Sequence, residues 1–173
     1  MIQKCSTWKV LSEFLKDPQK KHQIRGISKD IKLSTTSVKL HINKLIKAGL
    51  IVEKKDIFKY YIANFDNPKF RFYKKIDTLL KIEDSEILEY LNDILSPNTI
   101  ILFGSCAKGE DIYGSDLDLY CQAEEKKLDL KKFEKSLGRK IQLFFSEDLN
   151  KLPKELRNNI INGIKLDGYL KVF

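Results

Sequence analysis

The sequence predicts an α+β protein with two domains, and three observations lead to that expectation. Apolar residues recur at helical spacing over residues 7–47, whereas short β-branched runs alternate with helix patterns over residues 99–145. Charge is also divided unevenly: residues 1–83 carry 19 Lys and Arg against 8 Asp and Glu, a net of +11, and residues 84–173 carry 13 against 16, a net of −3. A genome-wide bias toward lysine, or adaptation to high temperature, would raise the lysine content of both halves of the chain. The asymmetry therefore indicates a polyanion-binding domain joined to a domain with a different function.

Length and cysteine usage narrow the class of protein. The 173 residues are enough for one large or two small domains. Cys5, Cys106 and Cys121 show no Cys-x-x-Cys spacing, which argues against a disulfide framework or a zinc site and favours a reducing cytosol. No basic and apolar leader opens the chain, and no apolar run approaches the length of about 18 residues that a membrane span needs. We therefore expect a cytoplasmic protein with no membrane partner.

The first domain is expected to contain three helices followed by two strands. Helix-spaced apolar residues predict helices over residues 7–16 and 35–47, with a short helix that ends near Lys32 between them. Two strand-like runs follow at residues 50–54 and 57–62, joined by a tight connection at Lys55-Asp56.

This order of elements, and above all the segment LSTTSVKLHINKLIKAGLI, resembles the winged helix-turn-helix domains of transcriptional regulators. The resemblance makes residues 35–47 the recognition helix, whose outward side chains contact base edges and phosphates in the major groove of duplex DNA. It also places two lysines at the tip of the wing, near the DNA backbone. The DNA-binding residues expected on this basis are Thr36, Ser37, Lys39, Asn43, Lys44, Lys47, Lys54 and Lys55. The alternative is a winged helix used only for protein contacts.

A cluster of turn-forming residues, 64–68, marks the end of the wing. The basic and aromatic stretch that follows could stack on single-stranded nucleic acid. However, Tyr73, Ile76, Leu79 and Leu80 have the spacing of an amphipathic helix, which favours a connector or a homodimer contact. The expected domains are residues 1–66 for the winged helix-turn-helix, 67–84 for the connector helix, and 85–173 for a small mixed sheet with helices.

The most informative stretch is residues 99–120, which read TIILFGSCAKGEDIYGSDLDLY. A short buried strand ends at Gly104-Ser105, and a second strand holds Asp116 and Asp118 on one face because strand side chains alternate. Two adjacent carboxylates raise each other's pKa unless a cation lies between them, and carboxylate oxygens are ligands that Mg²⁺ prefers. Gly104 lets a ligand approach the backbone, and the Ser105 hydroxyl and the amides after it can receive a phosphate. The pattern describes a triphosphate cradle beside a metal site.

Gly104-Ser105 followed by Asp116-x-Asp118, each at the edge of a strand, resembles the signature of the DNA polymerase β-like nucleotidyltransferases, and most closely their small minimal nucleotidyltransferase branch. The similarity covers residues 99–145 and continues more weakly to the C-terminus. It implies a nucleotidyltransferase fold in which Gly104, Ser105 and Ser115 bind an NTP, while Asp116 and Asp118 are catalytic and bind Mg²⁺ or Mn²⁺. The implied reaction transfers a nucleoside monophosphate to an acceptor hydroxyl. Such small domains are often paired with helical toxin proteins as antitoxins, so a toxin partner or a protein acceptor is also expected.

One expected acid is missing. In the family a third carboxylate lies on the next strand and completes the nucleophile-side metal site, but the best-matching position here is Gln142. Glu147 and Asp148 lie further on and could replace it only if the chain bends back. Two functions therefore stay open: an active nucleotidyltransferase fused to a DNA binder, or a catalytically weak or inactive nucleotide-sensing transcriptional regulator.

Overall fold

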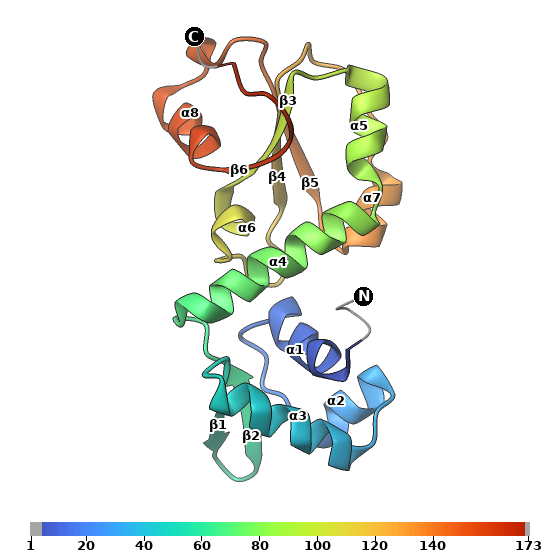
Figure 1. Cartoon of the computed structure of the whole chain (residues 1–173), viewed down its shortest axis with the longest axis vertical. Coiled ribbons are helices and arrows are strands. Elements are labelled where there is room, and N and C mark those ends of the chain that lie inside the picture. The colour runs from blue at the N-terminus through green and yellow to red at the C-terminus, as the bar shows by residue number, and fades with distance from the viewer. Residues whose placement is uncertain (1–4, 172–173) are drawn as a thin grey trace. The chain divides into compact units, whose positions relative to one another are not determined.

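The computed structural model describes residues 5–171 and shows a mixed α+β protein with small sheets (Figure 1). The chain divides into two compact units, residues 1–77 and 78–173. The division falls inside the long helix α4 (Pro68–Asp84), so this helix supplies residues to both units. No helix within residues 5–171 is long and apolar enough to span a bilayer.

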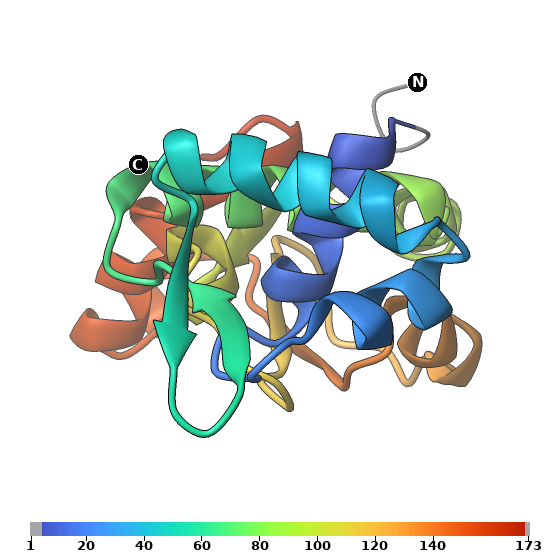
Figure 2. The same cartoon turned by 90° about the horizontal axis from the view of Figure 1, so that it is seen from below.

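The first unit consists of three helices and a two-stranded antiparallel hairpin. Its elements are α1 (Ser6–Lys16), α2 (Ile24–Ile31), α3 (Thr35–Lys47), β1 (Ile51–Lys55) and β2 (Lys59–Ala63). Figure 2 shows the hairpin continuing from the C-terminal end of α3. The apolar face of each helix is buried, and the core includes Trp8, Leu11, Phe14, Ile27, Val38, Ile42 and Leu45. Ser34 caps α3, since its hydroxyl accepts a hydrogen bond from the Ser37 amide at 3.2 Å.

The hairpin turn lies further along the chain than the sequence predicted. The register runs from Ile51 opposite Ala63 to Lys55 opposite Lys59, so residues 56–58 form the turn. Ile57 and Phe58, expected in the second strand, are therefore exposed in the turn, by 87% and 71%. A two-residue turn at Lys55-Asp56 would need positive φ at the first position or at both, which favours Gly, Asn-Gly or Asp-Gly there. Lys54 and Lys55 are the last two residues of β1 and lie beside this turn, whereas residues 56–58 form the tip itself.

Helix α4 buries charged side chains that its apolar spacing did not predict. Lys74 is 2% exposed, and its Nζ donates a hydrogen bond to the Leu15 carbonyl in the last turn of α1 at 2.6 Å. Asp77 is also buried, whereas Ile76 is only half-buried. A cation beside the final carbonyls of a helix is favourably placed. Lys74 thus fixes α1 against the part of α4 that belongs to the first unit.

The second unit is built on a mixed four-stranded sheet. Its elements are α5 (Ile87–Leu95), β3 (Thr99–Phe103), α6 (Gly104–Lys108), β4 (Leu117–Cys121), α7 (Lys131–Leu137), β5 (Ile141–Phe145), the 3₁₀ helix η2 (Leu149–Lys151), α8 (Lys154–Ile161) and β6 (Ile164–Gly168). The strand order is β5-β4-β3-β6, with β3 antiparallel to β4 and β6, and with β4 parallel to β5. In Figure 1, α5 and α8 lie on opposite sides of the sheet.

Both faces of this sheet are covered by apolar residues. Ile100 and Leu102 of β3 pack into one cluster with α5 and α7, whereas Ile101 and Phe103 pack into another cluster with η2 and α8. Every residue of β3 is buried as a result. This explains why the strand reads as a continuous apolar run rather than as an alternating one.

Several element boundaries differ from the expected ones. The Ser85 hydroxyl accepts from the Ile87 amide at 3.4 Å, but the residue directly before α5 is Glu86, whose φ is 60°. Asp116 precedes β4 instead of opening it. The terminal segment forms β6, and residues 172–173 lie outside the described residues.

Candidate functional site

Residues at the ends of three adjacent strands meet at one end of the second sheet. Phe103, the last residue of β3, lies opposite Asp118, and Asp118 lies opposite Gln142 of β5. Gly104 follows β3 directly, and Asp116 comes just before β4. The antiparallel pairing of β3 with β4 thus brings together the two halves of the motif that the sequence separates by eleven residues.

Gly104 makes direct room for the Asp118 carboxylate. Its φ is 71°, a left-handed conformation that side chains other than hydrogen rarely adopt. A Cβ added at this position would collide with Oδ2 of Asp118. The glycine is therefore required both by its backbone conformation and by the acid packed against it, which is a closer relation than the sequence predicted.

The two aspartates repel each other, as expected from their spacing. Burial and, after it, the negative charge of Asp116 raise the pKa of Asp118 above its usual value. Both side chains are half-buried, so each keeps access to solvent. A cation between them would relieve this repulsion.

Gln142 lies on the same side of the sheet as the acids and contacts one of them. Its Nε2 donates a hydrogen bond to Oδ2 of Asp116 at 2.6 Å. The alternation of β5 agrees with this placement, because Leu143 and Phe145 pack into the cluster on the opposite face. The position of the expected third acid is thus held by an amide that already binds one of the two carboxylates.

Glu147 and Asp148 do not take over the third position. Both follow the end of β5, where Phe145 pairs with Cys121, at the other end of β4 from Asp116. The Glu147 carbonyl accepts from Gln122, and the Asp148 carboxylate accepts from the Asn150 amide at 2.9 Å, where it caps η2. At roughly 3.3 Å per strand residue, the length of β4 separates them from the pair.

The two serines of the motif have different surroundings. Ser105 is the second residue of α6, where its carbonyl accepts from the Glu110 amide at 2.9 Å. The Ser115 hydroxyl accepts a hydrogen bond from the Ile112 amide at 3.0 Å, and the Ser115 amide donates to the Ile112 carbonyl. Ser115 therefore closes the turn that leads into Asp116, a local role that was not part of the expectation.

An arginine that was not predicted from the sequence stabilises this end of the sheet. Nη1 of Arg139 lies 3.1 Å from Oδ2 of the fully buried Asp111 and 2.9 Å from the sulfur of Cys106. The Cys106 thiol in turn donates to the Asp116 carbonyl at 3.3 Å. The arginine thus links α6, the following loop and the start of β5. Its place just before an apolar strand is the only sequence signal that could have singled it out.

The acid pair suits one divalent cation better than two. No group of three or more His, Cys, Asp or Glu in residues 5–171 is placed to hold a metal. Two carboxylates can share one Mg²⁺ whose other ligands come from phosphate and water, which is how this ion is commonly bound. A second ion would find only the neutral amide of Gln142.

In the first unit, the outward face of α3 forms a basic hollow. This α3 hollow has a volume of about 410 Å³ and is lined by Thr36, Lys39, Leu40, Asn43, Lys44 and Lys47. Five of the six residues expected on this helix contribute to it, whereas Ser37 is half-buried near the capped end. Leu40, 52% exposed, adds an apolar contact among the lysines.

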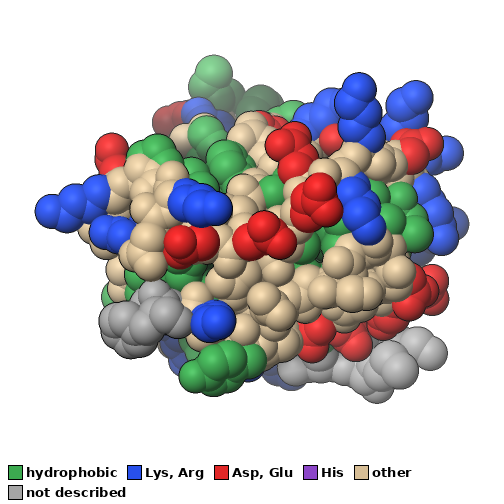
Figure 3. Space-filling view, turned by 90° about the horizontal axis from the view of Figure 1, so that it is seen from above, with side chains coloured by type: hydrophobic (Ala, Val, Ile, Leu, Met, Phe, Trp, Pro, Cys, Tyr) green, Lys and Arg blue, Asp and Glu red, His purple; other side chains and the backbone are tan. Residues whose placement is uncertain are grey.

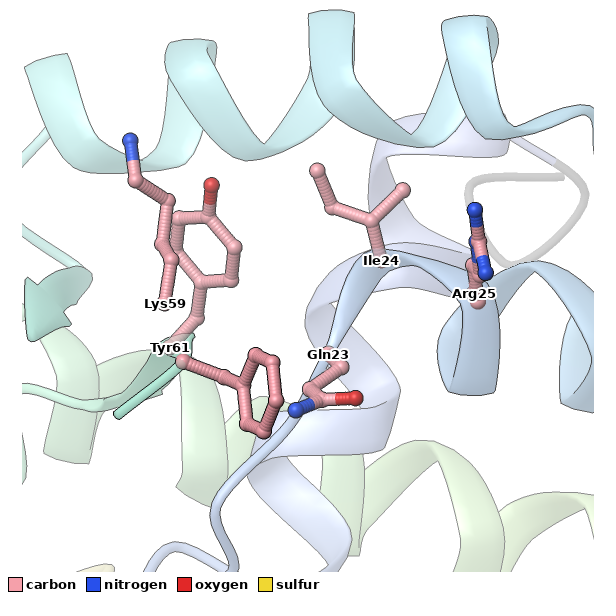
Figure 4. A pocket seen from close by; sticks show the side chains of 6 residues that line it. Gln23, Ile24, Arg25, Lys59 and Tyr61 are labelled. Carbon is pink, nitrogen blue, oxygen red and sulfur yellow. The ribbon is translucent and has the colours of Figure 1, made fainter. Parts of the chain in front are cut away.

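A second hollow lies between the start of α2 and β2 (Figure 4). Its volume is about 440 Å³, and its lining includes Gln23, Arg25, Lys59 and Tyr61. Figure 4 shows Lys59 and Tyr61 extending from β2 on one side and Arg25 from α2 on the other. Lys59 is also paired with Glu53 at 2.8 Å, so Arg25 carries the less compensated charge. By contrast, acidic and basic side chains are interspersed on the face shown in Figure 3.

Comparison with known proteins bears on the second unit. Residues 85–166 match the family model described as Polymerase beta, Nucleotidyltransferase. The matched segment runs from just before α5 into β6 and includes Gly104, Asp116 and Asp118. It supports a nucleotidyltransferase domain here and nucleotidyl transfer as the general class of activity. No curated protein and no solved structure matches the chain.

Proposed function

We propose that the protein is a DNA-binding nucleotidyltransferase that transfers a nucleoside monophosphate from an NTP to an acceptor hydroxyl, with cleavage of the α–β phosphate bond and release of pyrophosphate. The observation that carries the proposal is the packing of the Asp118 carboxylate against Gly104, where burial and then the charge of Asp116 raise the Asp118 pKa. A carboxylate that is partly buried beside a second one costs stability, which is typical of a functional site.

Each residue of the pattern has a distinct role in this proposal. Asp116 and Asp118 hold one Mg²⁺ or Mn²⁺ together with phosphate oxygens, and Gly104 and Ser105 receive the triphosphate. When bound, the cation neutralises charge on the phosphoryl oxygens and keeps the triphosphate in line. The Ser115 hydroxyl stabilises the turn before Asp116, and Arg139 stabilises α6 through its contact with the Cys106 sulfur. The chain's own side chains thus supply binding and orientation.

The first unit serves as the DNA-binding module in this proposal, in the manner of a winged helix-turn-helix. Its support is the order α1-α2-α3-β1-β2, the net charge of the N-terminal half and the α3 hollow with its three lysines. Lysines on an exposed helix face neutralise phosphates, and Asn43 and Thr36 can hydrogen-bond base edges. Arg25 is a further candidate for a phosphate contact.

A second function is favoured by one specific observation, the hydrogen bond from Gln142 to Asp116. An amide in the third position leaves the nucleophile side of the site without an anionic ligand, so nucleotide binding would persist while transfer slows. The protein would then report nucleotide levels to its DNA-binding unit as a transcriptional regulator.

The test is incubation of the full chain with each of the four α-³²P-labelled NTPs and Mg²⁺, with DNA, RNA, other proteins and the chain itself as acceptors. We expect metal-dependent nucleotide binding in every case and label transfer to one acceptor class. Asp118→Asn serves as the site control, and Glu125→Gln, an exposed acid that follows the end of β4 away from Asp116, as the matched control. Binding without transfer selects the regulatory function. Absence of metal-dependent nucleotide binding would overturn both.

A further inference from the structure

A third hollow in the first unit is a separate cavity that shares a single lining residue with the α3 hollow. It has a volume of about 330 Å³ and lies among α1, α3 and the first half of α4. Its walls are mostly apolar, formed by Trp8, Leu11, Leu45, Leu50 and Tyr73. Trp8 and Tyr73 meet edge to face with ring centroids 6.2 Å apart. A hollow of this size with aromatic walls and few polar groups is the usual form of a small-molecule site.

The polar groups of this cavity are gathered near the start of α1 and on α3. Cys5 precedes α1, Thr7 lies in its first turn, and Lys44 projects from α3. The amides of Trp8 and Thr7, and to a smaller extent Lys44, lower the pKa of the Cys5 thiol. Negative charge is therefore favoured at this part of the rim.

Lys44 also lines the α3 hollow. One ammonium group thus borders both the outward face of the proposed recognition helix and the apolar cavity. Of the residues that line the two hollows, it is the one they share. A ligand anion in the cavity and a DNA phosphate would compete for it.

We propose that this cavity binds a flat apolar molecule carrying one carboxylate-type anionic group, with the ring between Trp8 and Leu45 and the anion on Lys44. Because binding occupies Lys44, the ligand weakens the contact of α3 with DNA. This regulatory consequence rests on the DNA-binding part of the proposed function, whereas the ligand site itself does not. The apolar walls select for the ring and the single cation selects for the charge.

Two residues report directly on occupancy. Trp8 is the single tryptophan of the chain, so its fluorescence reports on the cavity alone. Cys5 is exposed, whereas Cys106 and Cys121 are buried and burial raises the pKa of Cys121 to about 12. Alkylation near neutral pH will therefore be selective for Cys5, and a bound ligand will slow it.

The test uses 1-naphthoate as the probe and its neutral counterpart 1-naphthamide as the matched control, added to the full chain. We expect naphthoate to quench Trp8 emission and to slow iodoacetamide labelling of Cys5. Naphthamide should bind roughly tenfold more weakly, because it cannot form the charged contact with Lys44. Equal affinity for the two probes, or no protection of Cys5, would overturn the proposal.

Three variants separate the cavity from the DNA-binding face. Ala48→Leu narrows the cavity from the C-terminal end of α3, and should abolish naphthoate binding while leaving DNA binding intact. Lys47→Met alters only the α3 hollow, and should weaken DNA binding without affecting naphthoate. Lys44→Met should weaken both and remove the competition between them. Unchanged naphthoate binding in Ala48→Leu and Lys44→Met would refute the site, whereas Cys5 protection in a chain that binds no DNA would support it and refute the DNA-binding part of the proposed function.

Discussion

The two units hold their candidate functional residues under opposite physical conditions. On α3 the charges are of one sign, exposed and spread over a helix of 13 residues. In the second unit two half-buried carboxylates lie against a glycine and an amide at one end of a sheet. Solvent screens the exposed charges, so each contributes little and contributions add. The half-buried pair acts together, so neither member can be lost without losing the site.

The largest effect should follow from breaking the acid pair. Asp118→Asn or Asp116→Asn should reduce Mg²⁺-dependent NTP affinity by more than the roughly 100-fold that loss of a group behind a metal ligand costs. Calorimetric titration of NTP with and without Mg²⁺ measures this. Affinity within twofold of the unsubstituted protein in the double Asn variant would show that the pair does not hold the cation.

Adding the missing acid sharpens the account of the second unit. Gln142→Asp should raise nucleotidyl transfer about tenfold or more, since one well-placed electrostatic group is worth roughly 100- to 1,000-fold. Without metal, three neighbouring carboxylates should lower the melting temperature, and Mg²⁺ should restore it. Gln142→Asn, which has the length of Asp but stays uncharged, is the control. Fast transfer by the unsubstituted chain that Gln142→Asp abolishes would contradict our interpretation of this position.

Single changes on α3 should be milder. Lys39→Ala should weaken binding of duplex DNA of any sequence and reduce the slope of log K against log salt by about one unit. Filter binding between low and physiological salt measures this slope, and the fold should be unaffected because Lys39 is exposed. Exposed Glu89→Gln of the second unit is the control. A change in sequence preference without a change in slope would mean that Lys39 reads bases instead of phosphates.

Two glycines, one in each unit, test the comparison between the units through protein stability alone. Gly26, in α2, has no atom within 4 Å of the position that a Cβ would take, so Gly26→Ala should stabilise the protein by about 0.5–1 kcal/mol. Gly104→Ala should destabilise it by at least about 1–2 kcal/mol, because the residue is left-handed and faces Asp118. Chemical denaturation of each variant gives both values. Equal changes in the free energy of unfolding for the two substitutions would show that Gly104 has no special structural role.

The smallest expected effect concerns pH. Because the pKa of folded Asp118 is raised, the folded protein binds its proton more tightly than the unfolded chain does. This contribution to stability is present when Asp118 is protonated, and is lost as pH rises through the folded pKa. Asp118→Asn should therefore gain slightly in stability over the unsubstituted protein at neutral pH but not near pH 3, without Mg²⁺. A gain in stability confined to acidic pH would contradict a raised pKa of Asp118 in the folded protein.

Local patterns in the sequence were sufficient for much of the fold. Helical spacing located α1 and α3 almost to the residue. The continuous apolar run predicted β3, and the motif placed Asp116 and Asp118 together. These features depend on periodicity and on neighbours a few residues away, which a sequence displays directly. Burial of Lys74 did not follow from them, because its partner is the distant Leu15 carbonyl.

Other features were decided only by tertiary structure. The contact of Gly104 with Asp118 depends on the pairing of β3 with β4, and the bond from Gln142 to Asp116 depends on the parallel register of β5. The distance that rules out Glu147 and Asp148 as substitutes has the same origin. The sequence by itself determined which residue types are present and how they alternate along each strand. Which of them touch was set by strand register and by packing on both sheet faces, because these bring together side chains that lie tens of residues apart.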